Sequence, residues 1–195
     1  MARVLVTHSY FYRLDQKQWK DARPYPPLGT LQAAAVLREA HEGRPGHDVA
    51  VHDLGLAHGP EELTPALDAH MPSIVVIHDD GFNYLTKMCL TVMREACFAL
   101  IALAKARGCL VAVSSSDSTD HYADYLDRGA DAVILGESEQ TLRELTDRWA
   151  DGVPWLDVAG IAFRNGHEVE ANPKRPVLRD LDTLPLPAWD LIDVA

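Results

Sequence analysis

The chain has 195 residues, of which 47% are hydrophobic and 24% are charged, which is enough for one domain with a substantial core. Eighteen basic and 29 acidic residues give a formal net charge of −11, which argues against a nucleic-acid-binding surface. No apolar run approaches the roughly 20 residues of a membrane span, and the three cysteines show no metal-ligand spacing, so we expect a cytoplasmic protein without a membrane span.

Strand-like and helix-like segments alternate along the first 150 residues. Runs rich in β-branched residues predict strands at 3–8, 48–52, 73–78, 109–114 and 131–135. Apolar residues at helical spacing predict helices at 30–42, 83–107, 119–128 and 138–150, and less regularly at 60–70. This alternation predicts an α/β fold of the Rossmann or flavodoxin-like type, a doubly wound sheet of five parallel strands in the order 2-1-3-4-5.

The pattern changes after about residue 152, so we expect an α/β domain at 1–152 and a second segment at 153–195. Asn165-Gly166 lies between two alternating runs and predicts a β-hairpin with a type I′ turn, which needs positive φ at both central positions. Residues 171–195 contain four prolines and little periodicity, which indicates a Pro-rich extended tail that straps back or links to another domain.

Ligands of open parallel sheets bind at the carboxyl ends of the strands, so the segment after the first strand is informative. Residues 9–29 are far more than the usual βα loop of about 2–6 residues. They hold five of the chain's aromatic residues, Tyr10, Phe11, Tyr12, Trp19 and Tyr25. We favour a folded lid over a large apolar ligand; the alternative is that these rings cover the edge of the sheet.

Polar residues follow the third, fourth and fifth predicted strands. The third is followed by His78-Asp79-Asp80-Gly81-Phe82, whose two carboxylates resemble the acidic pocket of a phospho-receiver domain. A receiver carries a lysine after its fifth strand, where this chain has Gly136-Glu137, so that interpretation is weak. One of the two aspartates equally suits a helix cap.

Small hydroxyl side chains gather after the fourth strand, in Ser114-Ser115-Ser116-Asp117, where they can bind a polar ligand and leave space for it. Part of this run also suits a helix cap. After the fifth strand a helix opens with Ser138 as a predicted N-cap, and its dipole would attract an anion. No Gly-x-Gly-x-x-Gly and no Walker sequence occurs, so a dinucleotide cofactor is not expected.

Of the nine histidines, only His8 and His78 end predicted strands on the ligand side. Each is either a core-edge histidine with a backbone partner or a functional group. The others are scattered over turns and surface positions and form no metal-ligand set. Cys89 and Cys97 share one predicted helix face with Met93, which is typical of a buried stripe.

Four segments in this order resemble the N-terminal cobalamin (B12)-binding domain and linker of B12-binding radical SAM enzymes: PYPPLGTLQAAAVLREA, HDDGFNYLTKMCLTVMREACFAL, SSSDSTDHYADYLDRGADAVILGESEQTLREL and LDTLPLPAWDLID. The resemblance covers about residues 3–193. It implies cobalamin as the cofactor, and methyl transfer or a radical rearrangement as the reaction of the full enzyme. A stand-alone corrinoid carrier or a cobalamin sensor that acts through a partner is the alternative.

In that family a second half supplies a Cys-x-x-x-Cys-x-x-Cys triad that holds a 4Fe-4S cluster and cleaves S-adenosylmethionine. This sequence has no such triad, so the resemblance implies a radical SAM barrel, in cis or in trans, as the partner. No catalysis is then expected from these residues alone. The Asp-x-His-x-x-Gly motif that supplies an axial histidine in methionine-synthase-type domains is also missing, which leaves His8 and His78 as possible substitutes.

The resemblance also implies the cofactor-binding residues. Tyr25, Pro26, Pro27, Leu28 and Gly29 would flank the corrin together with Tyr10. His78, Asp79, Asp80, Gly81 and Phe82 would face its lower side. Ser114, Ser115, Ser116 and Asp117 would stand where the family has the small Gly-Gly pair that admits the nucleotide tail. Gly136, Glu137, Glu139 and Thr141 would line the loop after the fifth strand.

Overall fold

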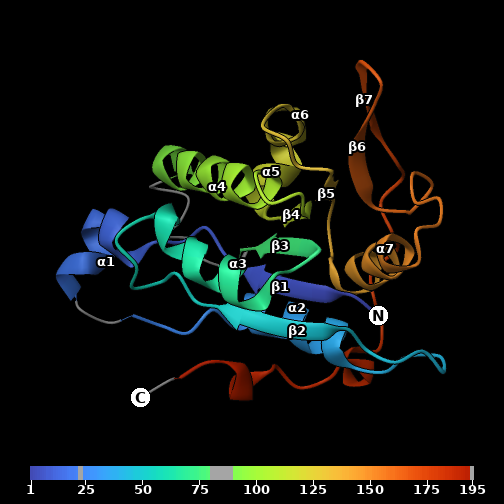
Figure 1. Cartoon of the computed structure of the whole chain (residues 1–195), viewed down its shortest axis with the longest axis horizontal. Helices are drawn as coiled ribbons and strands as arrows, with labels where there is room; N and C mark the ends of the chain where they lie inside the picture. Colours follow the sequence, from blue (N-terminus) through green and yellow to red (C-terminus); the bar gives the residue numbers. More distant parts are fainter. Residues whose placement is uncertain (22–23, 80–89, 194–195) are drawn as a thin grey trace.

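One seven-stranded sheet, in the order β2-β1-β3-β4-β5-β6-β7, forms the centre of the computed structural model, which describes residues 1–21, 24–79 and 90–193 (Figure 1). The parallel strands are β1 (Arg3–Thr7), β2 (Asp48–His52), β3 (Ile74–His78), β4 (Leu110–Ser114) and β5 (Ala132–Ile134). The predicted fold class and the order 2-1-3-4-5 are confirmed.

The two faces of the sheet bury alternate residues of each strand, as the doubly wound arrangement requires. Leu5, Val75 and Val111 face the cluster that includes α3 (Thr64–His70), α4 (Leu90–Lys105) and α6 (Tyr122–Asp127). Val4, Val76 and Ala112 face α2 (Leu28–Arg38) and α7 (Glu139–Asp151). Burial on both faces explains why the third to fifth strands are apolar without alternation.

Helix boundaries differ from the prediction at two places. The predicted helix 119–128 is two helices, α5 (Ser116–Asp120) and α6, because His121 leaves the helical region with φ −125° and ψ 31°. The predicted helix 30–42 ends at Arg38, since Glu39 is extended with ψ 137°. The 60–70 segment is a 3-10 turn, η2 (Pro60–Leu63), followed by α3. Of the predicted helix 83–107, residues 83–89 lie outside the described residues.

The predicted hairpin is present, but its turn is one residue further along. Asn165 is the last residue of β6 (Ile161–Asn165) and pairs with Glu168, the first residue of β7 (Glu168–Ala171), so Gly166 and His167 form the turn. Among non-glycine residues of the described chain, only Glu42 and Met71 have positive φ, while Gly166 has φ +61°. The type I′ turn is therefore wrong, and glycine at the first central position is typical of type II′.

The hairpin joins the main sheet, because β6 pairs antiparallel with β5. The sheet is thus continuous across residue 152, and the domain boundary stays a prediction. Residues 173–193, which we call the strap, return along the α2 side of the sheet and include η4 (Leu181–Thr183) and η5 (Trp189–Leu191) (Figure 1). The Ala188 N–H donates to Leu31 O at 3.2 Å, and Arg38 binds both carboxylate oxygens of Asp190.

The segment after β1 is folded, with η1 (Tyr12–Leu14) and α1 (Gln16–Asp21). Phe11 and Tyr12 are buried, and Phe11 belongs to the core cluster beneath α3 and α4. Tyr10 and Tyr25 stack with ring centroids 5.7 Å apart, and Tyr25 is 40% exposed. The five rings therefore divide between core and surface. Within the described ranges, no helix has both the length and the apolar character needed to cross a membrane.

Candidate functional site

A cavity of about 550 Å3 opens at the carboxyl edge of the sheet, beyond β3, β4 and β5. Its lining is His78, Asp79, Ser114, Ser115, Ser116, Thr119, Asp120, Gly136, Glu137, Ser138 and Glu139. The structure thus brings together the predicted site residues of three separate loops, apart from Asp117 and Thr141. Asp80, Gly81 and Phe82 lie outside the described residues, and their role stays a prediction.

Asp79 joins the ends of two neighbouring strands. Its carboxylate accepts hydrogen bonds from the N–H of Ser9 at 2.5 Å and from the Ser9 hydroxyl at 2.7 Å. Its own N–H donates to Ser114 O at 2.9 Å, which continues the β3–β4 pairing beyond the strand ends. Asp79 therefore fixes the floor of the cavity relative to β1. Ser9 was not among the predicted site residues, because only the fold brings it next to a residue 70 positions away.

His78 is held from two sides at the end of β3. Its Nε2 lies 2.8 Å from the hydroxyl oxygen of Ser138, and its carbonyl accepts a hydrogen bond from the Thr30 hydroxyl at 2.7 Å. Ser138 occupies the N-cap position of α7, but its side chain makes no cap hydrogen bond to that helix. The predicted N-cap position of Ser138 is therefore confirmed, but the hydroxyl does not cap the helix. It instead connects the loop after β5 to His78 at the end of β3.

Ser115 has a structural role besides lining the cavity. It is the N-cap of α5, and its hydroxyl accepts from the Ser118 N–H at 2.8 Å while the Ser118 hydroxyl accepts from the Ser115 N–H at 2.9 Å. This reciprocal capping box satisfies two backbone donors at the start of the helix. Ser116, the first residue of α5, is exposed. The Ser116 side chain therefore has no part in the cap, unlike that of Ser115.

Asp117 and Thr141 are committed to other partners. The Asp117 carboxylate binds Arg94 at 2.6 and 2.7 Å and accepts from the Tyr125 hydroxyl at 2.6 Å. Burial alone would raise the pKa of Asp117, but these hydrogen bonds outweigh it and lower the pKa. Thr141 is fully buried, and its hydroxyl donates to Ala159 O at 3.1 Å. Both residues support the loops around the cavity without lining it.

Gly136 and Glu137 line the cavity from the loop between β5 and α7. Gly136 has φ +89°, a conformation that glycine adopts without strain, and a Cβ there would meet only Lys174 at 3.9 Å. The Glu137 carboxylate accepts a hydrogen bond from the Leu178 N–H of the strap at 2.8 Å. Glu137 thus belongs both to the cavity and to the attachment of the strap.

The aromatic segment does not line this cavity. Tyr10 donates its hydroxyl to Asp15 at 3.2 Å, and burial together with the neighbouring Tyr25 and Asp15 raises the pKa of Tyr10. In the run 25–29, Pro27 is buried while Leu28 is 48% exposed. The expected contact of these residues with a ligand stays a prediction.

His8 is buried and both its ring nitrogens have partners. Nε2 lies 2.8 Å from an Asp53 oxygen, and Nδ1 accepts from the Tyr10 N–H at 3.3 Å. Burial alone would raise the pKa of Asp53, but the hydrogen bond from His8 contributes to lowering it. His8 is thus a core-edge histidine in this structure. No three His, Cys, Asp or Glu side chains of the described residues are close enough to hold a metal ion.

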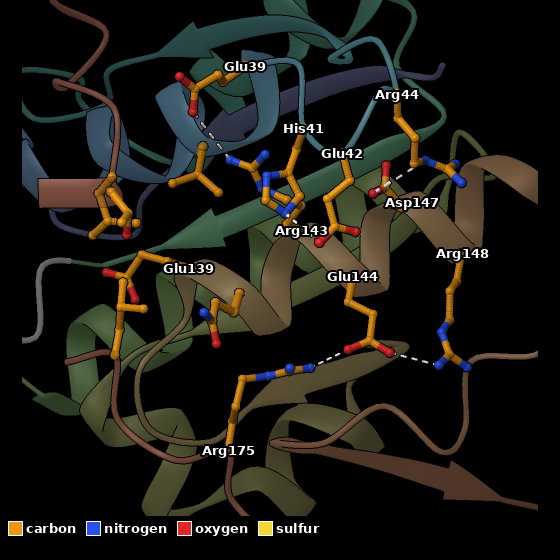
Figure 2. Close-up of a pocket in the computed structure, with 15 residues that line it drawn as sticks. Glu39, His41, Glu42, Arg44, Glu139, Arg143, Glu144, Asp147, Arg148 and Arg175 are labelled. Atoms are coloured by element: carbon orange, nitrogen blue, oxygen red, sulfur yellow. Dashed lines mark hydrogen bonds and ion pairs between the residues drawn. The ribbon is translucent and has the colours of Figure 1, made fainter. Parts of the chain in front are cut away.

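A second cavity, of about 500 Å3, lies between α2, α7 and the strap (Figure 2). Its charged residues largely pair with one another: Glu144 binds both Arg148 and Arg175, and Arg44 lies 3.7 Å from Asp147 (Figure 2). Glu139 lines both cavities. Because mutual pairing leaves fewer groups free for a ligand, we take the cavity at the carboxyl edge as the candidate site.

No protein-family model matches the chain. An uncharacterized methyltransferase of Pyrococcus horikoshii, PH0819, is 34% identical over 171 residues, which cover 86% of this chain. The chain spans about a third (34%) of the length of that relative.

Solved structures share the fold. The cobalamin-dependent S-adenosylmethionine radical enzyme OxsB, with aqua-cobalamin and S-adenosylmethionine bound, matches 98% of this chain and 24% of its own, with a TM-score of 0.69 and 16% identity. The radical S-adenosylmethionine methyltransferase TsrM from Kitasatospora setae, with cobalamin and a [4Fe-4S] cluster bound, matches 95% of this chain and 31% of its own. Its TM-score is 0.58 and its identity 18%. At these identities the likeness establishes the fold.

Proposed function

We propose that this chain binds cobalamin at the carboxyl edge of its sheet and serves as the cobalamin domain of a radical SAM enzyme. The observation that carries the proposal is the cavity beyond β3, β4 and β5, lined by small hydroxyl side chains. It lies where ligands of doubly wound sheets bind. The shared fold of two enzymes that have cobalamin bound supports the same ligand here.

The residues present fit the nucleotide tail of cobalamin better than the corrin ring. A cavity of about 550 Å3 is within the usual range for small-molecule sites, about 300–1,000 Å3, but a whole corrin with its amide arms is larger. Ser114, Ser115 and Ser116 would line the tail with small hydrogen-bonding groups, and Gly136 adds no side chain. The corrin would then lie outside the cavity, with its amide arms in reach of residues at the rim such as Glu137.

Methyl transfer is the reaction context that we favour. The relative from Pyrococcus horikoshii is named a methyltransferase, and so is TsrM. Cobalamin, when bound, supplies a cobalt that can carry a methyl group. The three cysteines are spaced by eight and twelve residues, and the described Cys97 and Cys109 are buried. Residues outside these 195 would therefore have to supply the cysteines of an iron–sulfur cluster.

A binding experiment tests the proposal. The purified chain is incubated with hydroxocobalamin, desalted and examined by visible absorption, with flavin mononucleotide and NAD as comparison ligands. We expect about one corrin per chain and little retention of flavin or nicotinamide. Ser116→Leu, which fills the cavity without removing the helix cap, should retain less corrin. A folded wild-type chain that keeps no corrin spectrum contradicts the proposal.

A further inference from the structure

The strap is anchored on both sides of the point where it meets the candidate site. On the hairpin side, Pro173 O accepts from the Gly160 N–H at 2.9 Å and Arg175 forms an ion pair with Glu144 of α7 (Figure 2). On the other side, Pro185 O accepts from the Gln32 side chain at 2.9 Å, and Ala188 is buried against α2. None of these anchoring residues lines the cavity at the carboxyl edge. The anchors therefore fix the path of the strap independently of that cavity.

Between the anchors, a hydrogen bond connects the strap to the cavity. The Leu178 N–H donates to Oε2 of Glu137 at 2.8 Å, and Glu137 lines the cavity from the loop between β5 and α7. Glu137 is otherwise exposed, and it follows the exposed Gly136, where a Cβ would meet only Lys174 at 3.9 Å. An exposed glutamate without such a partner would populate several rotamers, so the strap holds this carboxylate in one position.

We propose that the strap positions Glu137 for ligand binding, so that attachment of the strap and occupation of the cavity are coupled through the Leu178–Glu137 hydrogen bond. The inference rests on the proposed function and names a regulation of that site. With Oε2 held by Leu178, the other carboxylate oxygen remains available to an amide N–H of the ligand. Because coupling is reciprocal, cobalamin should tighten the strap by the same factor by which the strap tightens cobalamin binding.

Two pairs of variants separate the strap from the cavity. Leu178→Pro removes the N–H donor without changing a cavity residue, while Leu178→Ala keeps the donor and serves as the matched control. Glu137→Ala removes the acceptor, while Glu137→Gln keeps one side-chain oxygen for Leu178 and removes the carboxylate oxygen that would face the ligand. Cobalamin affinity is measured by visible titration, and exchange of the Leu178 amide by NMR with and without cobalamin. Circular dichroism verifies that each variant is folded.

We expect Leu178→Pro and Glu137→Ala each to weaken cobalamin binding about 5- to 10-fold, within the usual range of coupling between sites. Leu178→Ala should stay within about twofold of wild type. Glu137→Gln should keep the Leu178 amide protected but weaken cobalamin binding, because its NH2 group cannot accept the amide N–H of the ligand. The double variant Glu137→Ala with Leu178→Pro should lose no more affinity than Glu137→Ala alone, because Leu178 acts through the Glu137 carboxylate. Cobalamin should slow exchange of the Leu178 amide in the wild type but not in Glu137→Ala.

Equal affinity of wild type and Leu178→Pro overturns the inference, whatever the effect of Glu137→Ala, since Glu137 would then act without the strap. Additive losses in the double variant overturn it as well. Failure of the wild type to bind cobalamin overturns the proposed function first, and the inference with it. The wild-type titration distinguishes these failures. If Leu178→Pro proves misfolded, the amide exchange of Leu178 in wild type and Glu137→Ala decides alone.

Discussion

The Asp79 carboxylate receives both hydrogen-bond donors of Ser9, the backbone N–H at 2.5 Å and the hydroxyl at 2.7 Å. The two residues follow β3 and β1, which are neighbours in the sheet although β2 lies between them in the chain. This is the point where the strand order reverses, and where ligands of doubly wound sheets bind. Here the Ser9–Asp79 contact joins the two strand ends at that point, and the cavity beyond β3, β4 and β5 begins beside it, because Asp79 also lines the cavity.

Asp79→Ala should lower the free energy of unfolding by about 1–3 kcal/mol, because the Ser9 N–H and hydroxyl lose a charged acceptor. Ser9→Ala is the matched variant: it keeps the backbone N–H bond, so its loss should be smaller. Urea unfolding followed by circular dichroism measures both. A larger loss in Ser9→Ala than in Asp79→Ala would contradict the geometry.

Ser115 and Ser116 should separate stability from binding. Ser115→Ala removes the cap of α5 and should lower the free energy of unfolding by about 0.5–2 kcal/mol, with a smaller loss of cobalamin affinity than Ser116→Leu causes. Ser116→Leu leaves the cap and fills the cavity. An overpacking cost of about 1–3 kcal/mol corresponds to roughly a 5- to 150-fold loss of cobalamin affinity. Unchanged affinity in Ser116→Leu would mean that the nucleotide tail binds elsewhere.

Asp117 should contribute stability that acid removes. Although burial opposes it, hydrogen bonding to Arg94 and Tyr125 lowers the pKa of Asp117 below its ordinary value of 3.8. The contribution is therefore complete above about pH 4 and is lost as pH falls through the folded-state pKa. Asp117→Asn should cost about 1–3 kcal/mol at pH 7 and flatten the loss of stability below pH 4. Urea midpoints between pH 2.5 and 7, compared with wild type, check this; parallel pH profiles would refute it.

His47 should also make stability depend on pH, but here because the folded state disfavours the protonated, charged form of the side chain. Burial lowers the pKa of His47 below 6.5, against the attraction of Asp147, whose oxygen lies 3.2 Å from Nε2. The unfolded chain therefore takes up the proton first. Stability is complete above about pH 6.5 and declines as pH falls from there towards the folded-state pKa. His47→Gln should flatten the stability profile between pH 5 and 7 and leave the profile above pH 7 unchanged. NMR titration of the His47 ring provides a direct measurement.

Bound cobalamin should lack a histidine ligand from His8, because both ring nitrogens of His8 are engaged by Asp53 and Tyr10. Electron paramagnetic resonance of the reduced cobalt(II) form should give the same hyperfine pattern in protein labelled with 14N-histidine and with 15N-histidine. A pattern that changes with the label, and that His8→Ala abolishes, would identify His8 as the ligand instead. His78→Ala tests the other candidate in the same way.

The sequence predicts the parallel sheet well because burial on both faces leaves a local signature, as in the apolar run Ile74 to Ile77. The strand order alone determines that the loops after β3, β4 and β5 meet at one edge of the sheet. The sequence therefore predicts that residues from these three loops share a site. The hydrogen-bond partners of the individual side chains could not be predicted from the sequence. Ser138 looks like a cap and bonds to His78, and Glu137 looks like a ligand residue and binds Leu178, 41 positions away. Such contacts depend on the packing of distant segments, which has no local signal.

The hairpin that extends the sheet also gives it a protected border. Without β6 and β7, the short strand β5 would expose a row of unpaired backbone groups, which in general invites another chain to add a strand. The border now belongs to β7, where Glu168 and Glu170 are exposed. A second copy approaching this border would bring like carboxylates together. The hairpin thus opposes growth of the sheet into aggregates through repulsion between identical edges.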